Sequence, residues 1–169
     1  MKKIKSILIT VLLCSQFILL TNVLGDSLKI GEKNAKITVK VFSSLTCPHC
    51  ASFHNKVYKK LKKNYIDEKL VKLEHHAFPL DLAALNAEKI TRCAQNPDAK
   101  FELLSKIYDK QKEWAVGSDI KKINESLIKI GVDSKINESD LRACLDNEKT
   151  QELILKERIE AQKEYNISS

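Results

Sequence analysis

The chain has 169 residues, which is enough for one domain of ordinary size and too few for two. Apolar residues make up 43% of it, so the chain can bury a packed core. The formal net charge is +7, but basic and acidic residues are mixed along the chain without interleaved aromatic residues, which argues against a nucleic-acid-binding protein.

Residues 1–25 predict a secretory signal peptide. Three Lys among the first five residues precede a mostly apolar run, 7–20, that is too short for a comfortable membrane span. Val23 and Gly25 are small enough for the −3 and −1 positions of a cleavage site. An uncleaved N-terminal anchor is the alternative. Cleavage would leave four of the five cysteines, and an even number in an exported chain suits two disulfides.

The next segment predicts a βαβ unit. Residues 28–30 and 37–42 are expected to be strands, and the second, rich in β-branched residues, should lie in the sheet interior. Residues 71–78 alternate in polarity and predict a further strand, which Pro79 ends. A helix with apolar residues at Val57, Leu61 and Tyr65 should connect them.

From Leu82 onward the apolar periodicity predicts a series of helices. Asn96-Pro97 should stop the first of them, and Gly131 is expected in the C-cap position of a later one. Asn137 can cap the helix that follows, before a last long helical segment.

Between the strand at 37–42 and its helix lies Cys47-Pro48-His49-Cys50. Residues at i and i+3 share a helix face, so the two sulfurs can come close enough to bond. The first turn of a helix offers free N–H groups and the positive end of the helix dipole, which favour a thiolate. Cys47 should therefore be the exposed nucleophile and Cys50 the resolving thiol.

The residues inside the motif suit this role. Pro48 fits an early helical position, where no backbone N–H is needed, and His49 can add positive charge beside Cys47. Half of a zinc site and a purely structural disulfide are alternatives, although a complete metal-ligand set is not evident. Haem attachment would require His directly after Cys50, where Ala51 stands.

The run from Phe42 to Cys50, followed by Phe53-His54, resembles the active-site segment of the DsbA family, in its alphaproteobacterial branch. The resemblance implies an α/β thioredoxin-like fold with an inserted helical domain, and a periplasmic thiol:disulfide oxidoreductase. It implies no cofactor. Substrates would be reduced or misoxidised exported proteins, and an inner-membrane quinone-linked thiol oxidase would be a partner.

On this resemblance we divide the chain at its predicted boundaries: signal peptide 1–25, the dithiol-bearing part of the thioredoxin-like domain 26–80, the inserted helical domain 81–148, and a long returning helix 149–169. The branch also implies a structural disulfide between Cys93 and Cys144 in the helical domain. Two separate buried thiols are the alternative.

The sequence departs from the family in two places. Many members carry an acidic residue that helps move the proton of the second cysteine; Val41 stands at that position, and Glu74 is a possible substitute. The family's cis-proline loop should follow the last helix, but none of the three prolines fits it, so we expect a chain truncated before that loop. A catalytically impaired fragment that acts as a binding module, and a metal-binding exported protein, are the alternative functions.

The two neighbouring histidines of the last predicted strand, His75 and His76, should point to opposite faces of the sheet. A shared metal site is therefore not expected, but one of them could approach the dithiol.

Overall fold

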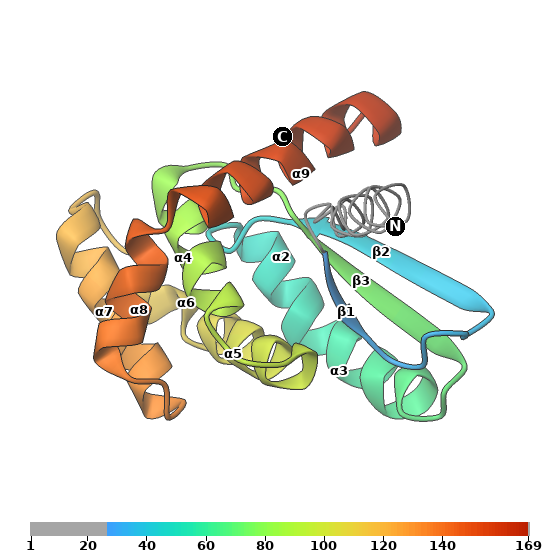
Figure 1. The fold of residues 1–169 in the computed structure, drawn as a ribbon. Coiled ribbons are helices and arrows are strands. Elements are labelled where there is room, and N and C mark those ends of the chain that lie inside the picture. The colour runs from blue at the N-terminus through green and yellow to red at the C-terminus, as the bar shows by residue number, and fades with distance from the viewer. Residues whose placement is uncertain (1–26, 169) are drawn as a thin grey trace, which may run out of the picture.

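The computed structural model describes residues 27–168, which form a small sheet covered by helices (Figure 1). The strands are β1 Leu28–Ile30, β2 Ile37–Ser43 and β3 Val71–Ala77, in the order β1-β3-β2. β2 pairs parallel to β3, as a βαβ unit requires, while β1 pairs antiparallel to β3. The prediction that 37–42 lies in the sheet interior is wrong for the described residues: β3 is central and β2 lies at an edge.

The pairing register decides which side chains share a face. Val41 is aligned with His75, and Lys40 is aligned with Glu74. Since successive side chains of a strand point to opposite faces, Val41 and His75 lie on one face and Glu74 on the other. His76 stacks on Phe42 on this second face, with ring centroids 4.7 Å apart.

The connection between β2 and β3 is a helix that changes its winding. It runs as α2 Pro48–Phe53, a π-helical stretch His54–Tyr58, α3 Lys59–Leu61 and a second π-helical stretch Lys62–Ile66. Along this helix Ala51, His54 and Tyr58 are buried, whereas Val57 is 49% exposed. The face that carries His54 therefore packs on the core, and the apolar Val57 lies outside it.

The helices that follow have mostly side-chain caps. They are α4 Leu82–Arg92, α5 Pro97–Asp109, α6 Gln111–Trp114, α7 Ile120–Asp133, α8 Glu138–Asp146 and α9 Glu148–Tyr165. Asp81 caps α4 by accepting a hydrogen bond from the Ala84 N–H, and Asn96 caps α5 in the same way. Asn137 occupies the N-cap position of α8, as predicted, but its amide donates to the Asp140 carboxylate at 3.5 Å.

Gly131 does not end a helix, contrary to prediction. α7 continues to Asp133, and Gly131 is buried where α7 packs on α8. A Cβ at this position would lie 2.5 Å from Cδ2 of Leu141, which is itself fully buried. The glycine therefore serves close helix packing rather than a turn.

One core joins the sheet to the helices. Leu73 of β3, Tyr58 of the connecting helix and Phe101 and Leu104 of α5 belong to the same buried cluster as Trp114. The helical region is thus packed directly against the sheet face that carries Val41 and His75. Among residues 27–168, no helix has both the length and the apolar character needed to cross a membrane.

Candidate active site

The two cysteines of the predicted dithiol lie where β2 passes into α2. Cys47 has extended backbone angles, φ −76° and ψ 120°, and is the N-cap of α2, while Pro48 occupies the first turn. The Cys47 N–H donates to the Ser44 carbonyl at 3.1 Å, and the Cys47 carbonyl accepts from the Ala51 N–H at 3.1 Å. Both Cys47 and Cys50 are partly buried free thiols.

The surroundings separate the two thiols chemically. Partial burial tends to raise the pKa of Cys47, but the backbone N–H and thiol of Cys50 and the backbone N–H of His49 together lower it below its ordinary value. Burial raises the pKa of Cys50 to about 11, and the neighbouring Cys47 adds to that rise. The site therefore makes Cys47 the more readily ionised of the two thiols and keeps Cys50 a thiol at neutral pH.

Pro48 and His49 are both exposed beside Cys47. His49 contributes to the Cys47 thiolate through its backbone N–H, a group that every non-proline residue in this place would supply. A charge effect of the imidazole stays a prediction.

Gln111 is a site residue that the sequence did not reveal. It comes from α6 and is only 7% exposed. Its Nε2 donates to the Leu45 carbonyl at 2.7 Å and to the Cys47 carbonyl at 3.0 Å, and so holds the loop that presents the dithiol. A lone Gln in a helical segment carries no motif, so no sequence signal could have marked it.

The loop is also tied to α4. The Thr46 hydroxyl donates to Oδ2 of Asp81 at 2.8 Å, while Oδ1 of Asp81 caps α4. Two helices far along the chain thus fix the segment just before α2. This fixation restrains Cys47 at its N-cap position.

A small cavity lies behind Cys50, on the inner face of the sheet. Its walls come from β2, β3, α2, the π-helical stretch and α5, and include Ser43, His54, His75 and Tyr108. His54 stacks between Tyr58 and Tyr108, at centroid distances of 4.3 and 4.8 Å. Burial lowers the pKa of His54 to about 4, with a smaller contribution from His75, so His54 is neutral at pH 7.

Of the two adjacent histidines, His75 is the one on the side of Cys50. Its Nε2 donates to Glu88 at 2.8 Å, and both side chains are buried. Glu74, the acid considered as a substitute at the sequence level, lies on the opposite face with Lys72 at 3.1 Å and His76 at 3.5 Å. It therefore does not face the Cys50 cavity.

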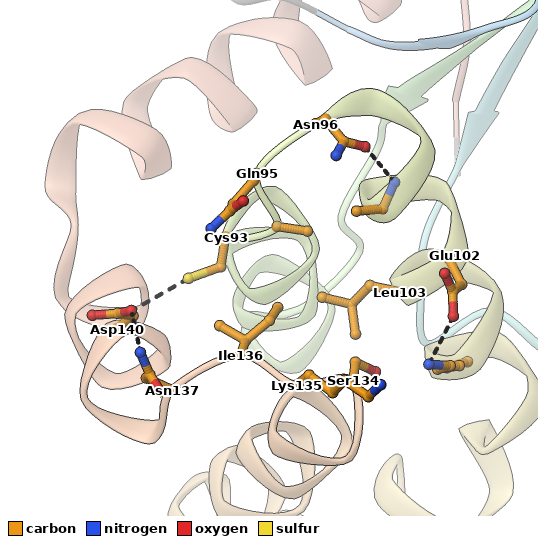
Figure 2. A pocket seen from close by; sticks show the side chains of 13 residues that line it. Cys93, Gln95, Asn96, Glu102, Leu103, Ser134, Lys135, Ile136, Asn137 and Asp140 are labelled. Atoms are coloured by element: carbon orange, nitrogen blue, oxygen red, sulfur yellow. Dashed lines mark hydrogen bonds and ion pairs between the residues drawn. The ribbon is translucent and has the colours of Figure 1, made fainter.

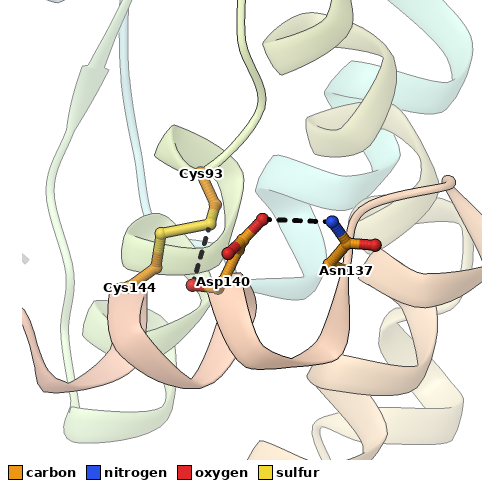
Figure 3. Close-up of a disulfide and its surroundings, with 4 residues drawn as sticks. All are labelled: Cys93, Asn137, Asp140 and Cys144. Atoms are coloured by element: carbon orange, nitrogen blue, oxygen red, sulfur yellow. Dashed lines mark hydrogen bonds between the residues drawn. A yellow bond between two sulfur atoms is a disulfide. The ribbon is translucent and has the colours of Figure 1, made fainter.

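Cys93 and Cys144 form a disulfide that joins the end of α4 to α8 (Figure 3). Their Cα atoms are 6.0 Å apart, and the residues are separated by 51 positions in sequence. A surface pocket of about 300 Å³ lies next to Cys93, between α5 and the loop that precedes α8 (Figure 2). Polar groups such as Asn96 and Asp140 line it, and it does not include the dithiol.

Within residues 27–168, no cluster of three or more His, Cys, Asp or Glu side chains has the arrangement of a metal site.

The comparison with known families agrees with this geometry. A family model described as Thioredoxin matches residues 24–169. The chain belongs to the thioredoxin family. Its relatives include proteins named for disulfide formation, and the solved structures that share its fold include DsbA proteins, which confirms the relationship predicted from the Cys47–Cys50 segment.

Three similarities illustrate the relationship. A candidate protein-disulfide oxidoreductase of Rickettsia conorii is 28% identical over 130 residues, 77% of this chain and 46% of the relative. Disulfide bond formation protein D of Bacillus subtilis is 28% identical over 110 residues, 60% of this chain and 49% of the relative. The crystal structure of Wolbachia pipientis alpha-DsbA1 superimposes with a TM-score of 0.78 at 23% identity, covering 92% of this chain and 75% of that one.

This thioredoxin-family chain thus spans about half the length of the curated relatives it matches. At 23% identity, the likeness to alpha-DsbA1 is one of fold.

Proposed function

We propose that this thioredoxin-family protein is a thiol:disulfide oxidoreductase that acts through Cys47 and Cys50. The observation that carries the proposal is the opposite shift of two thiols three residues apart: the pKa of Cys47 is lowered and that of Cys50 is raised. A low-pKa thiol that is accessible and a buried partner are what a nucleophile and a resolving thiol require.

In the oxidase direction, a substrate thiolate attacks Sγ of Cys47 in the Cys47–Cys50 disulfide. A Cys47–substrate disulfide forms, the Cys47–Cys50 bond breaks, and Cys50 leaves as a thiolate that takes up a proton. The second thiolate of the substrate then attacks the substrate sulfur, and Cys47 leaves as a thiolate. The substrate has lost two electrons, and the protein carries the reduced pair.

Each feature of the site supports one part of this exchange. N–H groups at the start of α2 stabilise the Cys47 thiolate when it leaves, which makes the disulfide a better oxidant. Gln111 holds the two carbonyls on either side of Thr46 and so keeps the Cys47 backbone in its N-cap geometry. The exposed Pro48 and His49 leave the approach to Cys47 open to a polypeptide.

The activity is tested with the purified chain and a reduced peptide that carries two cysteines and a fluorophore. Oxidation of the peptide by the Cys47–Cys50 disulfide is the expected result, and Cys47→Ser should abolish it. Cys50→Ser has no disulfide to transfer, so its Cys47 is first converted to a mixed disulfide with thionitrobenzoate. The thiolate of a one-cysteine peptide should then attack Sγ of Cys47, release thionitrobenzoate and leave a stable Cys47–peptide disulfide, visible by non-reducing mass spectrometry. Peptide oxidation that survives in Cys47→Ser would show that another thiol carries the reaction.

We also propose that the protein is exported to the periplasm. The basic start and apolar run of residues 1–25, which lie outside the described residues, support this, as does a Cys93–Cys144 disulfide of the kind found in oxidising compartments. Reduced exported proteins would then be its substrates, with a membrane-bound thiol oxidase to reoxidise it. N-terminal sequencing of protein from the periplasmic fraction should begin at Asp26; retention of Met1 in the cytosolic fraction would contradict export.

A further inference from the structure

A chain of four polar side chains crosses the core behind the dithiol: Tyr108 of α5, Ser43 of β2, His75 of β3 and Glu88 of α4. The Tyr108 hydroxyl donates to Ser43 Oγ at 3.0 Å, and Ser43 Oγ lies 3.3 Å from His75 Nδ1. His75 Nε2 donates to Glu88 Oε1 at 2.8 Å. The His75 side chain is 3% exposed and that of Glu88 is fully buried.

The hydrogen bonds of this chain can all run in one direction. When His75 carries its proton on Nε2 and donates that N–H to the Glu88 carboxylate, Nδ1 is unprotonated and accepts a hydrogen bond from the Ser43 hydroxyl. Ser43 Oγ in turn accepts from Tyr108, whose oxygen keeps a free acceptor position. A proton given to Tyr108 can therefore pass through Ser43 to His75, where the Glu88 carboxylate balances the imidazolium charge. A serine, a histidine and a carboxylate move protons in this way in hydrolases.

Cys50 lies at the open end of the same chain. One cavity of about 20 Å³ is lined by Cys50 together with Ser43, His75 and Tyr108. One water needs roughly 10–15 Å³ together with polar partners, so the cavity is large enough for a single water. Burial raises the pKa of Tyr108, and its hydrogen bond to Ser43 opposes that rise. The charges of Glu88, then Cys50 and Cys47, add to the rise.

Other ionisable groups near Cys50 do not suit the task. His54 has a pKa of about 4, chiefly because of burial, and its Nε2 is engaged with Ser105 at 2.8 Å. Glu74 lies on the far face of the sheet. Val41, which faces the cavity, carries no proton acceptor.

Glu157 of α9 is the other acid whose charge interacts with Glu88, and it pairs with Arg92 at 2.8 Å and accepts the Ala77 N–H at 3.1 Å. Within the described residues, one carboxylate oxygen of each acid, Oε2 of Glu88 and Oε1 of Glu157, is buried without a hydrogen-bond partner. A buried carboxylate with an unmatched oxygen costs stability, and a buried ion pair often contributes little, so packing alone is a weak reason for the His75–Glu88 pair.

We propose that Tyr108, Ser43, His75 and Glu88, here called the Glu88 relay, exchange the proton of Cys50 during thiol–disulfide exchange. When Cys50 leaves as a thiolate, the relay supplies its proton and Tyr108 is reprotonated through Ser43 from His75. In the reverse step the Cys50 thiol gives its proton to the relay, and its thiolate attacks Sγ of Cys47. The Cys47–Cys50 bond forms as the bond from Cys47 to the second sulfur breaks, and that sulfur leaves as a thiolate.

This inference rests on the proposed function, and one experiment separates the two. Protein with a reduced Cys47–Cys50 pair and an intact Cys93–Cys144 disulfide, checked by mass, is mixed with one equivalent of dithiobis(nitrobenzoate). Cys47 attacks first and releases one coloured thiolate; Cys50 then attacks the mixed disulfide and releases the second. Stopped-flow absorbance thus reports the nucleophile in its first phase and Cys50 deprotonation in its second.

Glu88→Gln keeps the shape of the side chain but removes the charge that balances a protonated His75. We expect the second phase to slow by about tenfold or more at pH 7, since positioned acid–base groups contribute on the order of 10²–10⁴ in rate. The apparent pKa in the pH profile of the second phase should also rise, toward the value of a thiol that ionises without a relay. The rate of the first phase should stay unchanged. Tyr108→Phe removes the other end of the relay without a buried charge change and should slow the same phase.

Glu74→Gln is the matched control, because it makes the same chemical change beside His75 but on the opposite face of the sheet. Its two phases should equal those of the parent. The relay is refuted if Glu88→Gln and Tyr108→Phe both keep the second-phase rate and pH profile of the parent. If Glu88→Gln does not fold, the second phase of Tyr108→Phe alone decides whether the relay is refuted. Absence of the first phase in the parent would instead refute the proposed function.

Discussion

Removal of the Cys93–Cys144 disulfide should destabilise the helical region strongly. The bond links α4 to α8 across 51 positions; both cysteines are partly buried, and Cys93 packs against the apolar core. In the loop-entropy model, a cross-link of this span lowers the free energy of the folded state relative to the unfolded chain by about 4 kcal/mol. For a domain of this size, each kcal/mol corresponds to roughly 2–4 °C, so the midpoint of thermal unfolding should fall by about 10 °C.

The assay is denaturant unfolding followed by circular dichroism, with Cys93→Ala/Cys144→Ala compared with the oxidised parent. Alanine is chosen because both positions are partly buried and Cys93 packs against the apolar core. Cys47→Ser/Cys50→Ser is the control, since it removes two thiols without a cross-link in this structure and should change stability much less. A loss below about 1 kcal/mol in the alanine variant would refute the loop-entropy reasoning, because it would mean that the unfolded chain is already restricted in that region.

Three further predictions concern the dithiol and its supports. Thiolate absorbance against pH should give a lowered pKa for Cys47 in Cys50→Ser and a raised pKa for Cys50 in Cys47→Ser. His49→Leu should leave the pKa of Cys47 below normal; a return to the value of free cysteine would show that the imidazole is required. The pKa of His54 is about 4 in the folded protein and 6.5 in the unfolded chain. The free energy of unfolding should therefore be highest above pH 6.5 and should fall by about 3 kcal/mol as the pH is lowered to 4; His54→Gln should remove this dependence in unfolding measured across the same range. Gln111→Ala leaves two backbone carbonyls without their side-chain donor and should cost about 1–3 kcal/mol in denaturant unfolding, whereas Gln95→Ala, at an exposed position, should be near neutral.

Local sequence was sufficient for most of the elements. β1 and α4 begin where alternation or periodicity placed them, and Cys47 lies at the start of α2 because strand, polar link and Pro48 are all local signals. One local prediction failed because of tertiary packing. Gly131 was expected to end its helix, but α7 continues to Asp133 and the close approach of Leu141 from α8 decides the glycine's place.

The predicted redox pair, its N-terminal helical setting and the thioredoxin-type βαβ unit follow from residues close together in the chain, since hydrogen-bonding and dipole effects at a helix start act within one turn. The groups that complete the site come from elsewhere: Gln111 from α6 and Glu88 from α4. A lone glutamine or glutamate in an amphipathic helix resembles any solvated side chain in sequence. Only the packing of those helices against β2 and β3 buries them, strips away their water and so directs their hydrogen bonds to the dithiol loop and to His75.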